Sequence, residues 1–302
     1  MEFSLICPAC GNSFFSDYLS TRDFALTNQE FQLKICETCG TLATTPQPDE
    51  VSINRYYQFD HYISHTNQSK NKLISAIYKT VRTYALKQKR KVIEKRCSST
   101  PKSILDIGCG TGLFLNEMKN AGWQIAGIEP ALIARKQAEK LLNSTIYSAV
   151  DELAKKTFSV ITFWHVLEHL HQPDKTLTYC YQLLRPGGLL VVALPNYLSY
   201  DAAHYKSLWA AYDVPRHLWH FNRGGMQILL SRLGYSLKEV RPMTFDSFYV
   251  SLLSEQYRDG QPCSTKKYAR ALITGLKSNL KAARNGQYSS LLYIAEKKYE
   301  MV

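Results

Sequence analysis

The chain has 302 residues, of which 45% are hydrophobic, enough for one large domain and a small one around buried cores. Lysine and arginine outnumber aspartate and glutamate by 37 to 25, and the formal charge of +12 favours an anionic partner. No run of eighteen apolar residues lacks a charge, and no basic segment followed by a long apolar one opens the chain. Composition therefore predicts a cytoplasmic protein without a transmembrane segment.

Two Cys-x-x-Cys pairs open the sequence. "CPAC" contains Cys7 and Cys10, and "CETCG" contains Cys36 and Cys39. Each pair can direct two thiolates at one ion, and four thiolates complete the tetrahedral coordination of structural zinc. Disulfides are less favoured, because no export signal indicates an oxidising compartment. We predict a zinc-ribbon-like module over residues 1–45.

A polar, aromatic connector and a long basic amphipathic helix, "KLISAIYKTVRTYALKQKRKVIEK", are predicted over residues 46–99. A solvated face explains the charge of this helix better than contact with membrane or RNA does. From residue 100 to 302, short apolar runs alternate with helical segments, which predicts an α/β domain with a parallel sheet. A helical insertion is expected at about 248–286, before the last run, "SSLLYIAEKK".

The stretch "ILDIGCGTGLFL" places Gly108, Gly110 and Gly112 in the first strand-to-helix turn, where open parallel sheets bind ligands. It is neither a dinucleotide fingerprint nor a phosphate-binding P-loop. Asp106 would repel a pyrophosphate and attract a cation, while Glu129 ends the second run and can accept hydrogen bonds from ribose hydroxyls. S-adenosylmethionine has a sulfonium and an ammonium but no phosphate, so it is the predicted cofactor.

Four segments, "LDIGCGTG", "GIEP", "FSVITFWHVLEHL" and "LLRPGGLLVVALPN", resemble successive motifs of class I S-adenosylmethionine-dependent methyltransferases. That family includes sugar C-methyltransferases and ubiquinone-type O-methyltransferases. The resemblance implies a Rossmann-like sheet of seven strands, with "TIYSAV" as the third and the last strand beside the sixth. It also implies that Pro130, Trp164 and His165 line the cofactor, together with the acids and glycines of the first two motifs.

Methyl transfer to a hydroxyl or an acidic carbon needs a base, and histidine is the first candidate near neutral pH. Sugar C-methyltransferases have a four-cysteine zinc module before the same fold and a Tyr-His-Glu-His-Leu segment whose final histidine is a proposed base. "VPRHLWHF" resembles that segment, which implies that His217 is the base. His220, three residues later, and His165, at the end of the "FSVITFWHV" run, are the further candidates. Arg216 replaces the glutamate and can instead bind a phosphate or carboxylate of the acceptor.

The predicted function is methyl transfer from S-adenosylmethionine to an oxygen or carbon of a small or glycan-type, anionic metabolite. One alternative is an RNA methyltransferase that uses the zinc module and the basic surface. It ranks second because the aromatic residues cluster in the "DAAHYKSLWAAYDVPRHLWHF" segment and no Asn-Pro-Pro-Tyr motif is present. Another alternative is a non-catalytic, zinc-stabilised binding protein, against which the intact cofactor motifs argue.

Overall fold

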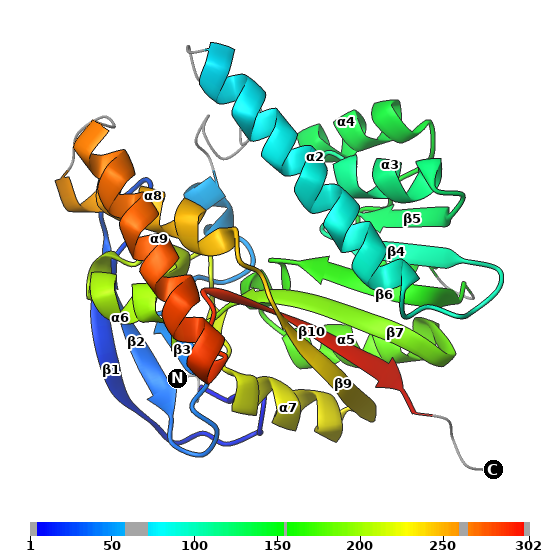
Figure 1. Cartoon of the computed structure of the whole chain (residues 1–302). Helices are drawn as coiled ribbons and strands as arrows, with labels where there is room; N and C mark the ends of the chain where they lie inside the picture. The colour runs from blue at the N-terminus through cyan, green and yellow to red at the C-terminus, as the bar shows by residue number, and fades with distance from the viewer. Residues whose placement is uncertain (1–4, 58–71, 154–155, 260–264, 299–302) are drawn as a thin grey trace. The chain divides into compact units, whose positions relative to one another are not determined.

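The computed structural model describes residues 5–57, 72–153, 156–259 and 265–298 (Figure 1). Part of the predicted connector, residues 58–71, lies outside them. The division into 1–45, 46–99 and 100–302 stays a prediction. The chain forms two compact units, the first of Met1–Tyr57, His165–Thr178 and Val192–Ile294, and the second of Gln58–Trp164, Tyr179–Val191 and Ala295–Val302.

A four-stranded antiparallel sheet belongs to the first unit. Residues such as Phe31 and Leu33 alternate with more exposed neighbours and bury one face of the sheet. Its last strand comes from a distant part of the chain, because Leu42 pairs with His220 and Ala43 with Trp219. In order, the strands are β1 (Phe15–Arg22), β2 (Glu30–Cys36), β3 (Leu42–Thr45) and β8 (Trp219–His220).

A six-stranded sheet has a parallel centre, where β4 pairs with β5 on one side and with β6 on the other. β4 is buried along its whole length, as expected for a strand covered on both faces. The last strand of the chain lies between β7 and β9, which confirms the predicted order. That order is β5 (Gln124–Ile128), β4 (Ser103–Ile107), β6 (Phe158–Trp164), β7 (Leu184–Pro195), β10 (Ser290–Lys297) and β9 (Tyr235–Pro242).

The predicted third strand, "TIYSAV", is absent from the described part of this sheet, which has six strands where seven were expected. Tyr147 forms only an isolated parallel bridge with Ile128. The next backbone N–H groups, of Ser148 and Ala149, donate to Oε1 of Glu152 at 2.9 and 3.0 Å. These donors close a turn and are therefore not free to extend the sheet.

Helices follow the strands in the alternation that the sequence predicted. The long basic helix is α2, and α8 and α9 fall within the predicted insertion. None of the described helices combines the length and apolar character needed to cross a membrane. The α-helices are α2 (Lys72–Glu94), α3 (Leu113–Asn120), α4 (Leu132–Leu142), α5 (Pro173–Leu183), α6 (Tyr200–Tyr205), α7 (Arg223–Arg232), α8 (Asp246–Asp259) and α9 (Thr265–Asn285).

Short 3₁₀ helices connect several of these elements. They are η1 (Ser52–Tyr57), η2 (Val150–Leu153), η3 (Leu167–His169), η4 (Lys206–Leu208) and η5 (Ala210–Tyr212).

Candidate active site

The glycine loop connects β4 to α3 in the second unit. Gly108, Gly110 and Gly112 have φ angles of 67°, 54° and 80°, in the left-handed region that favours glycine. A Cβ on Gly110 would meet no atom within 4 Å, whereas one on Gly112 would lie 3.0 Å from Cβ of Ala138. Gly110 therefore leaves the backbone open to a ligand, and Gly112 lets α3 begin close to α4.

Glu129, at the end of β5, holds this loop. Its Oε2 accepts a hydrogen bond from the Gly110 N–H at 2.8 Å, and its Oε1 accepts one from Ala131 N–H at 2.9 Å. A carboxylate offers about four acceptor positions, so each oxygen keeps capacity for a ribose hydroxyl. Pro130 follows directly and is exposed. The predicted ribose-binding acid therefore also positions the glycine loop.

Asp106 lies at the end of β4, and Oγ1 of Thr162 donates a hydrogen bond to its Oδ1 at 2.6 Å. Burial raises the pKa of Asp106 to about 7, although the Thr162 hydrogen bond and the charge of Lys89 oppose this shift. A bound cation would favour the ionised carboxylate. This environment suits the positively charged cofactor predicted from the sequence.

Trp164 ends β6 beside two side chains that the sequence did not single out. Phe114 packs edge-on against its ring with 5.2 Å between centroids, and Nζ of Lys89 lies 4.1 Å from the ring centroid. An aromatic face that attracts an ammonium also attracts a sulfonium. Lys89 was missed because it is one of many basic residues in α2, and its position beside Trp164 depends on tertiary packing.

Replacing Glu129 with alanine is expected to weaken S-adenosylmethionine binding by about 1.5 to 3 kcal/mol, or roughly ten- to a hundredfold. The variant loses the acceptors for the ribose and leaves the Gly110 N–H without its partner. Titration calorimetry measures the change in Kd. Glu129→Gln, which keeps one acceptor oxygen, should lose less affinity than Glu129→Ala. Equal affinity in all three proteins would contradict this role.

A cluster of two histidines and a glutamate lies in the first unit, and two of its members, Glu168 and His169, come shortly after β6 in the chain. Ligand atoms of Glu168, His169 and His217 all lie within 4.8 Å of one another, and the two imidazole centroids are 4.5 Å apart. Neither Glu168 nor His169 was among the site residues predicted from the sequence. Two imidazoles and a carboxylate are also a donor set that can hold a metal ion.

His217 has a defined neutral tautomer. Its Nδ1–H donates to the carbonyl oxygen of Ala211 at 2.9 Å, because a carbonyl can only accept. Nε2 therefore carries the lone pair. It lies 3.9 Å from Oε1 of Glu168 and 4.0 Å from Oδ2 of Asp213, beyond hydrogen-bonding distance of both. This nitrogen is available to accept a proton.

Glu168 is buried, and neither carboxylate oxygen has a hydrogen-bond partner among the described residues. Burial alone would raise its pKa, but His165, His217 and His169 together hold the pKa below its usual value. The cluster therefore surrounds a buried negative charge. Such a charge stabilises an imidazolium that forms beside it, which is the charge produced when a histidine removes a proton.

His220 is less suited to act as a base. Oγ1 of Thr44 donates its only hydrogen to the carbonyl oxygen of His217 at 2.6 Å, so it accepts from Nε2–H of His220 at 3.1 Å. Burial, and secondarily the charge of His217, lowers the pKa of His220 well below its usual value. The observed contacts thus give His220 a structural connection between β8 and β3.

His165 has a φ of 57°, a left-handed conformation that costs energy in a residue other than glycine. Its Nε2 lies 3.1 Å from Oδ2 of Asp246, and its Nδ1 lies 3.6 Å from Oε1 of Glu168. Burial lowers its pKa, but these carboxylates outweigh burial and raise it to about 9. A protonated imidazole cannot accept a proton, so this environment favours His217 over His165 as base.

Arg216 does not offer its guanidinium to an acceptor, contrary to the interpretation based on the sequence. The side chain is 1% exposed, and Nη2 contacts Asp23 at 2.8 Å and Asp213 at 2.7 Å. Nη1 also donates to the carbonyl oxygen of Tyr56 at 3.1 Å. Asp23 and Tyr56 come from distant parts of the chain, so Arg216 links residues 216–222, here called the histidine segment, to η1 and to the residue that follows β1.

Aromatic and apolar side chains surround the polar centre of the cluster. The gap that they enclose is too narrow for a water molecule, so these side chains must move before an acceptor reaches Nε2 of His217 by this route. The lining residues are Glu168, Leu194, Pro195, Tyr197, Trp209, His217, Trp219, His220 and Phe221.

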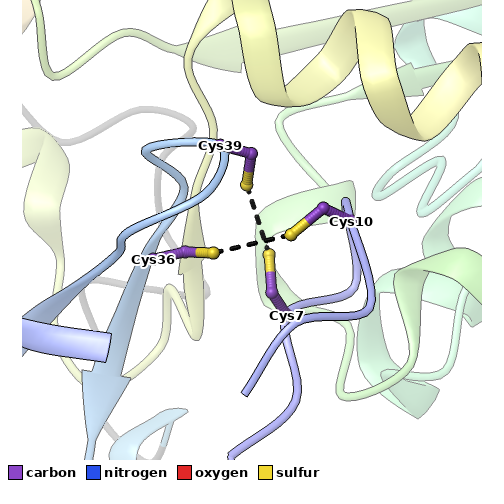
Figure 2. A group of neighbouring side chains, drawn as sticks. All are labelled: Cys7, Cys10, Cys36 and Cys39. Atoms are coloured by element: carbon purple, nitrogen blue, oxygen red, sulfur yellow. Dashed lines mark hydrogen bonds between the residues drawn. The ribbon is translucent and has the colours of Figure 1, made fainter. Parts of the chain in front are cut away.

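The four cysteines of the two pairs converge, as Figure 2 shows. Sγ of Cys7 lies 3.5 Å from Sγ of Cys39, and Sγ of Cys10 lies 3.5 Å from Sγ of Cys36. All four sulfurs are within 4.8 Å of one another. Tetrahedral zinc with Zn–S bonds of about 2.3 Å separates its sulfurs by about 3.8 Å. The thiols therefore fit a zinc ion closely.

The strand order and the glycine loop after the first strand of the large sheet define a class I methyltransferase fold. A family model described as a methyltransferase domain matches residues 78–240, more than half of the 302-residue chain. The chain therefore belongs to this methyltransferase domain family.

Curated relatives match part of the chain. A ubiquinone biosynthesis O-methyltransferase of Rhizobium etli is 34% identical over 123 residues, which are 38% of this chain and 49% of the relative. Its mitochondrial counterpart from Rattus norvegicus is 29% identical over 163 residues, covering 48% and 47%. The chain thus spans about half the length of these relatives.

One solved structure extends the similarity in fold to most of the chain. Haemonchus contortus phosphoethanolamine N-methyltransferase 2, in complex with S-adenosyl-L-methionine, has a TM-score of 0.50 at 17% identity. The match covers 94% of this chain and 69% of that protein. At this identity the similarity concerns the fold alone.

Proposed function

We propose that the protein transfers a methyl group from S-adenosylmethionine to a hydroxyl group of a small molecule. The observation that carries this proposal is the Nε2 lone pair of His217 beside the buried carboxylate of Glu168. In the sequence, Glu168 follows four residues after Trp164, which ends the strand at the predicted cofactor site. The names of the O-methyltransferase relatives favour oxygen over carbon as the methylated atom.

The roles that we propose for the individual residues follow from the chemistry of an in-line displacement. Asp106, Glu129 and the glycine loop bind and orient the cofactor, which supplies an activated methyl group. His217 takes the hydroxyl proton through Nε2, while the Ala211 carbonyl fixes its tautomer. Glu168 stabilises the imidazolium that results. The aromatic lining of the cluster favours an acceptor with an apolar body.

The anionic or glycan-type acceptor predicted from the sequence is a finer proposal. Arg216 is paired with Asp23 and Asp213, so the proposal of an anionic acceptor is supported by the formal charge of +12 and not by a binding residue. RNA is the competing acceptor. The many phosphate contacts of RNA would make its binding fall steeply with salt concentration, whereas a small acceptor with one or two charges would show a much weaker salt dependence.

A structural zinc ion is the second part of the proposal. Cys7, Cys10, Cys36 and Cys39 would fill all four positions of a tetrahedral ion, which leaves no site for a substrate. Zinc there would have a structural role.

Incubation with methyl-labelled S-adenosylmethionine tests the function. A small-molecule metabolite extract, an RNA extract and a buffer blank serve as acceptors, and mass spectrometry identifies the labelled product. We expect the label on an oxygen of a small molecule. Label confined to RNA would replace the proposed acceptor class, and a wild-type protein that binds no cofactor in calorimetry would contradict the methyltransferase proposal and support a non-catalytic binding role.

A further inference from the structure

Helix α9 is the long orange helix in Figure 1. Its largest apolar side chains are exposed to solvent. Leu272, Ile273, Leu276 and Leu280 are each more than half exposed, and Tyr268 is 43% exposed. Tyr268, Leu272, Leu276 and Leu280 follow one another at intervals of four residues, and Ile273 lies three residues before Leu276, so the five form one stripe along the helix, here called the leucine stripe. An amphipathic helix of a globular domain normally turns such a stripe toward the core.

The opposite face of α9 is buried and carries small side chains. A Cβ on Gly275 would lie 2.6 Å from Cδ1 of Phe248 in α8, a distance that real Cβ atoms do not show. Oγ of Ser278 donates to Oδ1 of Asp201 in α6 at 2.7 Å, and Ala282 is buried on the same side. Leucines turned to this side would have no space, so the packing itself directs the leucine stripe outward.

A row of exposed basic side chains borders the leucine stripe. Lys277 and Arg284 follow Ile273 and Leu280 by four residues, so they lie along the edge of the stripe. Helix α9 contains no aspartate or glutamate. The carboxylate of Glu255 in α8 contacts α9, and it is paired with Arg258 and Arg270. The basic row consists of Lys266, Lys277, Lys281 and Arg284. Arg270 is left out of the row because it is paired with Glu255.

We propose that this face of α9 docks on the surface of a membrane that contains anionic lipids. The helix lies in the plane of the interface, with the leucine stripe in the boundary between headgroups and acyl chains. The basic row contacts lipid phosphates, and each cation adds to the attraction of the negative surface. Since no described helix can span a membrane, this association is peripheral.

A second copy of the chain is a poorer occupant of this face. A two-fold contact through the leucine stripe would bring two basic rows close together, and α9 has no acidic side chain to offset their repulsion. An acidic groove of another protein is the remaining alternative. Vesicle flotation distinguishes a second copy and a protein groove from a membrane surface.

Vesicle flotation tests the proposal with the full-length protein and without cofactor or acceptor, so its result is independent of methyl transfer. The vesicles contain phosphatidylcholine alone or with phosphatidylglycerol. We expect wild-type protein to float with the phosphatidylglycerol vesicles and to dissociate as salt is raised. Leu276→Glu should reduce partitioning at least about tenfold, because burial of one leucine is replaced by a charge.

The matched control is Ile228→Glu, a change of similar chemistry at a residue of α7 that is 40% exposed. It should leave partitioning unchanged, and circular dichroism should show the same melting curve for both variants and wild type. Equal flotation of wild type and Leu276→Glu overturns the proposal. The proposal is also overturned if wild-type protein floats equally with and without phosphatidylglycerol. In that case, a dimer in sedimentation that Leu276→Glu dissociates would identify a second copy as the occupant, and a monomer would identify a groove of another protein.

Discussion

Replacement of His217 by glutamine is expected to lower turnover by at least about a hundredfold and to change the affinity for S-adenosylmethionine by less than about twofold. Glutamine is a polar side chain of similar length, but it has no nitrogen lone pair that accepts a proton near neutral pH. The residues proposed to bind the cofactor are elsewhere in the chain. Loss of the base therefore acts on the transition state alone.

Single-turnover kinetics and calorimetry measure the two quantities separately. His204→Gln is the matched control, because it makes the same change at an exposed histidine of α6 and should retain activity. Parallel losses of cofactor affinity and rate would mean that His217 has a structural role. Activity that depends on added divalent cation, at constant zinc content, would instead assign Nε2 of His217 to a metal ion held with Glu168 and His169.

Replacement of Cys36 by serine is expected to reduce bound zinc from about one ion per chain to near none and to destabilise the protein by about 4 kcal/mol or more. Three thiolates and a hydroxyl no longer complete the tetrahedral site. Elemental analysis and thermal denaturation measure these effects. Cys97→Ser changes a buried cysteine outside the cluster and should keep the zinc.

Cys36→Ser is also expected to lose turnover, because residues next to the four cysteines form hydrogen bonds with the histidine segment. The Thr44 N–H donates to the carbonyl oxygen of Leu218 at 3.0 Å, and Nδ2 of Asn222 donates to that of Cys39 at 3.1 Å. Disorder of the module therefore reaches His217 through these bonds. Wild-type activity in a zinc-free protein would show that the module and the histidine segment are independent.

Helix α9 illustrates what the sequence pattern leaves undetermined. Its period predicts a helix with an apolar and a polar side, and the usual expectation buries the leucines. The structure buries Gly275, because the space beside Phe248 admits no Cβ, and it buries Ser278, which donates a hydrogen bond to Asp201. Which side of an amphipathic helix faces the core is a property of the partner surface, and residues of that surface are distant in the sequence.

By itself, the sequence determined the α/β alternation, the glycine loop and the two Cys-x-x-Cys pairs. Each of these depends on residues close together in the chain, whose spacing limits the local backbone or the ligand that they can hold. Only the tertiary structure decided that Arg216 forms a buried ion pair with Asp23 and that Thr44 fixes the tautomer of His220. It also placed the Glu168 carboxylate, whose oxygens have no hydrogen-bond partner among the described residues, beside His217. Such contacts join residues far apart in sequence, and no local pattern records which distant partner satisfies a buried charge or hydrogen-bond donor.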